Sequence, residues 1–96
     1  MTSETAIHYL EGLRASALHA INCMAAGSAY TLLDLGLAYG FPGGFPEEGG
    51  DLITAKIKIQ FALMSLDPES GLDPSYWGDC MDKAVELLSR PITLQV

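Results

Sequence analysis

Positively charged residues are scarce in this sequence. Five Lys and Arg stand against 12 Asp and Glu, which gives a formal net charge of −7. Nucleic acids and anionic membrane surfaces attract proteins through clustered positive charge. The composition therefore argues against direct binding to either of them and admits a protein partner with a basic surface.

Residues that commonly carry catalysis or bind metals are also few. The chain has two Cys and two His, and it contains no phosphate-binding glycine loop, dinucleotide-binding fingerprint or nucleophile elbow. We therefore expect a protein that is not an enzyme and holds no cofactor. The two cysteines, Cys23 and Cys80, do not form a disulfide framework, although the sequence leaves a single bridge open.

Long apolar runs are missing too. The longest stretch without a charged residue, residues 15–33, contains His19, Asn22 and Thr31, which a membrane-spanning helix disfavours. The first residues include Glu4 and lack the basic segment of a secretory leader. These observations predict a cytoplasmic protein that does not enter a membrane.

Apolar residues at helical spacing are abundant. The 96 residues suit one domain with one modest core. Residues 51–66 are the most continuously apolar segment, and Asp51 is a candidate N-cap because it follows two glycines. Only Thr54, Lys58 and Ser65 form a polar strip on this segment, so we expect a helix that is buried at the centre of the fold.

Three further helices are predicted around this segment. The periodicity favours helices over residues 3–26, 28–39 and 74–90, the last of them capped by Asp73 and ended by Pro91. A single all-α domain over residues 1–96, a compact bundle of three to four helices with one long Gly/Pro/Phe loop, is the predicted fold.

Two groups of small residues stand out near the second predicted helix. Residues 25–29 are either a joint between two helices or a close-packing site inside one long helix. Gly36 and Gly40 lie one helical turn apart, a spacing that could let another backbone approach closely, although in a soluble protein the spacing by itself indicates little.

An α+β fold is the alternative. Residues 56–61 alternate polar and apolar side chains as a half-buried strand does, and residues 92–96 form a β-prone tail that could pair with it. Helix is favoured because the central apolar segment is longer than most strands and loses the alternation in its second half.

The segment GFPGGFPEEGG, which precedes the central helix, is the longest predicted loop. Phe41 and Phe45 stand in it, although loops mostly run over the wet surface. We expect Phe41 to pack under the helices and Phe45 to face a partner. Together with Glu47, Glu48 and Asp51 they form a candidate partner-binding site, because aromatic residues dominate interfaces and carboxylates suit a basic surface.

A metal site is a weaker hypothesis. His8, Glu11 and His19, with Glu4, lie on one side of the first predicted helix, where they hold a metal only if other helices add ligands. Their spacing matches no established metal-binding motif, so an ordinary solvated face is favoured.

Three classes of function fit these observations. The first is a non-enzymatic interaction module, an adaptor or inhibitor that docks on a larger protein. One subtype blocks a basic nucleic-acid-binding surface, as phage-encoded inhibitors of bacterial defence do. The second class is a homo-oligomeric structural protein, for example a homodimer, and the third is a small metal- or ligand-binding protein.

Overall fold

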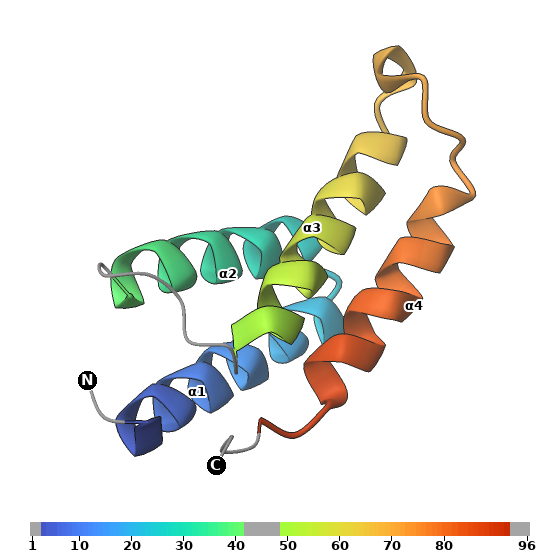
Figure 1. The fold of residues 1–96 in the computed structure, drawn as a ribbon. Helices are drawn as coiled ribbons and strands as arrows, with labels where there is room; N and C mark the ends of the chain where they lie inside the picture. The colour runs from blue at the N-terminus through green and yellow to red at the C-terminus, as the bar shows by residue number, and fades with distance from the viewer. Residues whose placement is uncertain (1–2, 42–48, 93–96) are drawn as a thin grey trace.

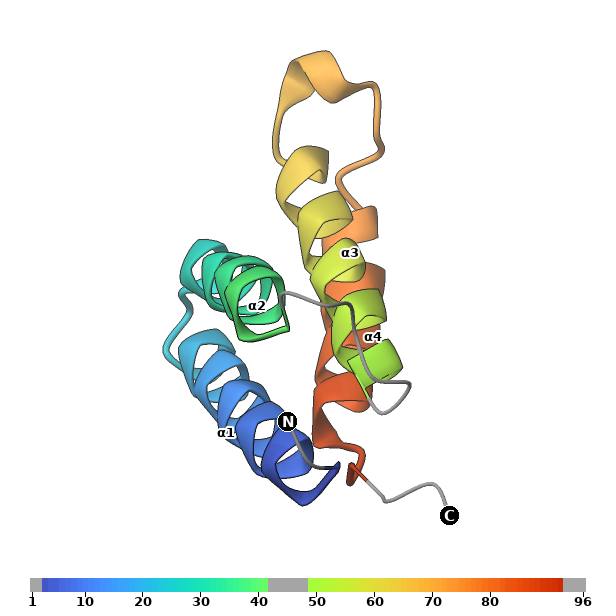
Figure 2. The ribbon, with the colours of Figure 1, turned by 60° about the vertical axis from the view of Figure 1, so that its left-hand side comes forward.

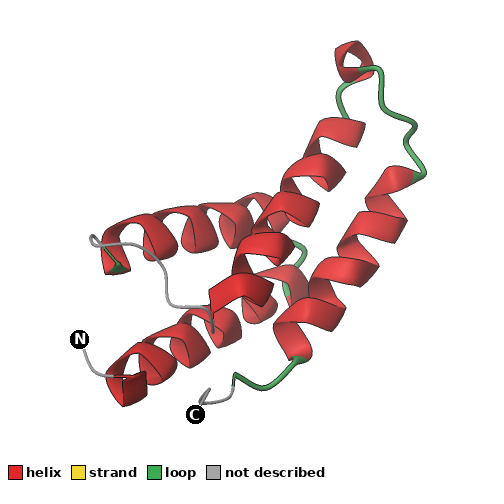
Figure 3. Cartoon of the chain, viewed as in Figure 1, coloured by secondary structure: helices red, strands yellow, loops and turns green. Residues whose placement is uncertain are grey.

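The computed structural model describes residues 3–41 and 49–92, and the regular structure in these ranges is helical (Figure 1). The elements are α1 (Ser3–Asn22), α2 (Ala26–Gly40), α3 (Gly50–Ser65), the short 3-10 helix η2 (Pro68–Ser70) and α4 (Tyr76–Ser89). The predicted all-α bundle is confirmed. The α+β alternative is wrong, because residues 56–61 lie in the middle of α3 and no strand occurs in the described ranges (Figure 3). Residues 93–96 of the tail lie outside those ranges.

The four α-helices form two antiparallel pairs. A short joint connects α1 to α2, and a linker that includes η2 connects α3 to α4. Figure 2 shows that the α3/α4 pair extends beyond α1 and α2 at the end where η2 lies. The contact between α3 and α4 is the most extensive in the fold, whereas α1 and α4 meet over a much smaller area. No helix in the described part of the chain is long and apolar enough to cross a bilayer.

One hydrophobic core joins all four α-helices. Its members with no exposed surface are Leu10, Ala17, Ala29, Leu33, Leu52, Ala55, Ile59, Ala62, Ala84 and Leu88. The alanines take up little space, so the helices can pack closely. Each large side chain that is buried in this way contributes about 1.5–3 kcal/mol to folding.

The prediction that α3 is buried on nearly all sides is wrong. Ile57, Phe61 and Met64, which share one face of the helix, are 40–44% exposed. Ser65 was expected in the polar strip but is buried, and its hydroxyl is satisfied there by the hydrogen bond that it donates to the carbonyl of Ala62, 2.6 Å away. The other helices cover one side of α3 and leave its outer side to solvent.

The first helix ends earlier than the sequence predicts. Met24 has a φ of 60°, so the helix cannot continue to residue 26. The N–H of Ala25 donates to the carbonyl of Ala20, and the N–H of Met24 donates to the carbonyl of Ile21, at 2.8 and 2.9 Å. This pair of bonds is a Schellman motif, which closes α1 and lets the chain turn into α2. Residues 23–25 are therefore the joint, slightly ahead of the position predicted for it.

Both predicted N-caps take different roles. Gly49 is the N-cap of α3, and Asp51 lies in the first turn, where its charge favours the positive end of the helix dipole. The carboxylate of Asp73 accepts a hydrogen bond from the N–H of Ser75 at 2.9 Å. Because α4 begins only at Tyr76, this bond stabilises the turn before the helix.

Gly36 and Gly40 are the places where α1 packs most tightly on α2. A Cβ at Gly36 would lie 2.5 Å from the tip of Leu13, and one at Gly40 would lie 2.5 Å from the ring of Tyr9. The Tyr9 hydroxyl also donates to the carbonyl of Gly36 at 2.7 Å. The close approach at these glycines is made by side chains of α1 and not by another backbone, as the spacing had suggested.

Gly40→Ala is expected to destabilise the protein. The added methyl group collides with the rigid Tyr9 ring, which cannot swing away without losing its hydrogen bond to Gly36. Overpacking of this kind costs about 1–3 kcal/mol. Gly12→Ala is the matched control, because a Cβ at Gly12 meets no atom within 4 Å and the change gains up to about 1 kcal/mol of helix propensity. Urea denaturation of both variants measures the difference, and a Gly40→Ala variant as stable as the parent contradicts the expectation.

Candidate functional site

Two of the residues predicted to bind a partner lie in the described part of the chain, and both contact other parts of the fold. Phe41 packs half-buried on the core and edge-to-face on Tyr9, with 5.4 Å between the ring centroids. The carboxylate of Asp51 lies 3.7 Å from the guanidinium of Arg90, so it joins the start of α3 to the end of α4. The remaining predicted residues lie outside the described ranges: Phe45, Glu47 and Glu48.

The candidate metal ligands are spread along the solvent side of α1. His8 and His19 are exposed, and the helix separates them by about 16 Å at its usual rise per residue. Nε2 of His19 lies 3.7 Å from Sγ of Cys23. Within residues 3–41 and 49–92, no three His, Cys, Asp or Glu side chains, Glu11 and Glu4 included, are grouped closely enough to hold a metal ion.

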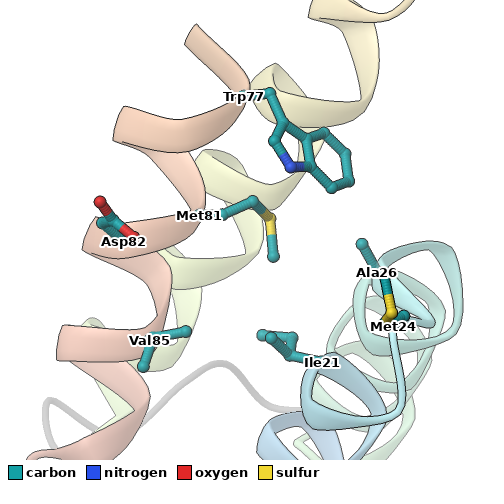
Figure 4. Close-up of a pocket in the computed structure, with 7 residues that line it drawn as sticks. All are labelled: Ile21, Met24, Ala26, Trp77, Met81, Asp82 and Val85. Carbon is teal, nitrogen blue, oxygen red and sulfur yellow. The ribbon is translucent and has the colours of Figure 1, made fainter. Parts of the chain in front are cut away.

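An apolar groove lies between the C-terminal half of α1 and α4 (Figure 4). Its volume is about 340 Å³, and the described residues that line it are Ile21, Met24, Ala26, Trp77, Met81, Asp82 and Val85. Figure 4 shows Trp77 and Met81 of α4 facing the side chains from the end of α1 and the start of α2, with the carboxylate of Asp82 at the outer edge, turned away from them. Asp82 is the one ionisable residue among these seven.

The groove exists because α1 and α4 touch over a short length. Nη1 of Arg14, in the middle of α1, donates to the backbone carbonyl of Arg90 at 2.6 Å. From this contact α1 runs obliquely to α4, as the two views in Figure 1 and Figure 2 show. Ile21 and Trp77 are only partly buried, although both pack on the core. They therefore present apolar surface to whatever enters the groove.

Met24 stands at the groove in an uncommon backbone conformation. It has the one positive φ among the described non-glycine residues, and it is 94% exposed. The position it occupies in a Schellman motif is usually glycine, because a Cβ is disfavoured in the left-handed region. The conformation costs about 1–2 kcal/mol, and the exposed side chain recovers little of this by burial.

An acidic stretch leads into the α4 wall of the groove. Residues 66–82 contain no Lys or Arg and five exposed carboxylates: Asp67, Glu69, Asp73, Asp79 and Asp82. None of the five forms an ion pair with a described residue. The cations of α4 are engaged elsewhere, because Lys83 and Arg90 both pair with Glu86. Of the five carboxylates, Asp82 lines the groove, and the stretch as a whole contains no compensating base.

Hydrogen bonds hold two carboxylates of this region in their charged form. The Arg90 guanidinium, with the Lys83 ammonium, lowers the pKa of Glu86 below its ordinary value. The backbone N–H of Ser75, and then its hydroxyl, lower the pKa of Asp73. Both carboxylates therefore keep their charge to a lower pH than an ordinary Asp or Glu.

Sequence reasoning missed the groove because its residues look like ordinary core residues. Trp77 and Met81 belong to the apolar stripe of the last helix, and Ile21 and Met24 belong to that of the first. Periodicity shows that each stripe exists but does not show that the two meet on a partly open surface. The one feature of the sequence that could have drawn attention to α4 is the stretch at residues 66–82, which contains five carboxylates and no Lys or Arg.

Comparison of the chain with protein families, curated proteins and solved structures finds no match. The groove offers apolar surface with a carboxylate at its edge.

Phe41→Ala is expected to lower the free energy of unfolding by about 1–2 kcal/mol, because it removes a half-buried ring from Tyr9 and the core, and full burial of a Phe is worth about 1.5–3 kcal/mol. Tyr39→Ala is the control, since Tyr39 is close in sequence and 80% exposed, and surface changes of this kind stay within about 0.5 kcal/mol. Thermal or urea unfolding of both variants gives the comparison. Equal effects at the two positions would mean that the Phe41 contacts add nothing to stability.

Proposed function

We propose that this protein is a non-enzymatic interaction module of the cytoplasm that binds an amphipathic, basic helix of a larger protein in the groove between α1 and α4. The observation that carries the proposal is the combination of apolar walls with the unpaired acidic stretch at residues 66–82. Amphipathic helices commonly bind by laying an apolar face into such a groove. Complementary charge then orients the partner and speeds its association.

The composition of the groove favours a macromolecular partner over a small ligand. Sites for small molecules usually combine apolar walls with several convergent polar groups. Here Asp82 is the one ionisable residue among the described lining residues, and the space is open on one side. A helix can fill such a space with a few apolar side chains and keep its remaining surface in water.

Two further features support the details of the proposal. Cys23 and Cys80 are both free thiols, which suits the reducing conditions of the cytoplasm. Basic surfaces and helices are common in nucleic-acid-binding proteins. An inhibitor that occupies such a surface is therefore the narrower form of the proposal, and an adaptor is the broader one.

The proposal is tested with two synthetic helices that share a leucine face and carry either lysine or glutamate on the polar face. We expect the protein to bind the leucine/lysine helix and not the leucine/glutamate helix in fluorescence anisotropy. Binding should weaken steeply with salt, because exposed charges more than about 10 Å apart are screened at 0.1 M. Equal binding of both helices, or of neither, argues against the proposal.

Charge-removing variants locate the interaction. Asp79→Asn with Asp82→Asn is expected to weaken binding of the leucine/lysine helix roughly tenfold, equivalent to about 1.4 kcal/mol, chiefly through slower association. Glu4→Gln with Glu11→Gln removes the same charge from α1 away from the groove and should have a small effect. If both pairs weaken binding equally, the effect is one of net charge and the groove is not the site.

The outer side of α3 favours a second candidate function, a homo-oligomer. Ile57, Phe61 and Met64 are exposed and share this side with uncharged Gln60. Their spacing is close to the heptad spacing by which helices of two copies pack. The net charge of −7 opposes association of two copies, which makes this candidate the second one.

Light scattering over a range of protein concentrations tests the second candidate. Self-association through α3 predicts a mass that rises toward that of a dimer and falls back to the monomer in Phe61→Ser. Leu35→Ser, at a 48% exposed position on α2, is the control and should still associate. A constant monomer mass at all concentrations excludes this candidate.

A further inference from the structure

Among the residues that line the groove, Met24 contributes least to the folding stability of the unbound protein. Its backbone has a φ of 60°, a conformation that glycine adopts without strain. It is 94% exposed, so burial of the side chain contributes little to folding. Strained backbone conformations of this kind are concentrated at functional positions. The stability of the monomer therefore does not explain a methionine at this position, and a role in binding does.

The position of Met24 suits contact with a bound chain. It lines the groove beside Ile21 and Ala26, across from Trp77 and Met81 (Figure 4). Backbone hydrogen bonds that close α1 hold its main chain in place, whereas its side chain extends into solvent. An unbranched thioether adapts its shape to apolar partners of different form.

We propose that Met24 is a partner-binding anchor that packs over the apolar face of a basic helix in the groove, an inference that rests on the function proposed above. Asp82 lies at the outer edge of the opposite wall and is the last carboxylate of the acidic stretch (Figure 4). A bound helix therefore turns its apolar residues toward Met24 and a lysine or arginine toward Asp82. This charge complementarity selects a cationic helix over a neutral or acidic one.

Two substitutions separate the side chain from the backbone strain. Met24→Gly removes both, and Met24→Leu keeps an apolar side chain on the strained backbone. We expect Met24→Gly to raise Tm by roughly 4–8 °C, because glycine adopts this backbone conformation without strain and a modest gain in stability shifts the Tm of a small domain by that amount. The same variant should bind the leucine/lysine helix about tenfold more weakly. Met24→Leu should change both quantities little.

Methyl NMR of the protein labelled at methionine gives a readout that does not depend on substitution. We expect the Met24 methyl signal to shift when the leucine/lysine helix is added, while the signal of Met64 on the outer side of α3 stays in place. A protein that binds the helix without a Met24 shift, or whose Met24→Gly variant binds equally well, overturns the anchor and leaves the proposed function standing. A parent protein that does not bind the helix overturns both.

Discussion

The packing of α3 against α4 is the contact on which the rest of this structure depends. It is the most extensive helix contact in the fold, and it places fully buried residues of both helices, among them Ile59 and Leu88, in the shared core. The ion pair of Asp51 with Arg90 joins the two helices at one end. The other pair, α1 and α2, then packs on α3 chiefly through α2 and reaches α4 over a small area. The groove between α1 and α4 is the result of that asymmetry.

Most of the basic residues in the described chain form ion pairs, whereas the carboxylates of residues 66–82 form none. In the described chain, the bases that form ion pairs do so within the fold: Lys56 with Asp34, Lys83 with Glu86, and Arg90 with Asp51 and Glu86. Exposed pairs of this kind are worth at most about 1 kcal/mol each, so their effect on stability is small. Their effect on the surface is larger, because they leave the acidic stretch at residues 66–82 without a neutralising partner. The net negative charge of that stretch follows from this distribution.

Met24 illustrates how stability and binding can oppose each other at one position. The joint between α1 and α2 needs a residue in the left-handed region, and glycine meets that need at the lowest strain. The chain places a large apolar side chain there, next to the apolar wall of the groove. Such a choice is understandable where interactions absent from the monomer repay the strain. Gly36 and Gly40 show the opposite case. There the absence of a side chain leaves room for Leu13 and Tyr9 to pack closely, so glycine favours the stability of the fold.

Periodicity in the sequence predicted the four α-helices, and the composition gives the net charge of −7. Both are properties of single residues or of neighbouring positions, so they can be read without a structure. The predicted N-caps and the groups that approach Gly36 and Gly40 differ in the structure. Which side of α3 is buried, the ion pair of Asp51 with Arg90, the groove between the stripes of α1 and α4, and the end of the first helix at Met24 follow only from the tertiary packing. These features depend on which helix faces pack together. Four helices share one core, so they cannot bury every apolar face, and the packing determines which faces stay exposed.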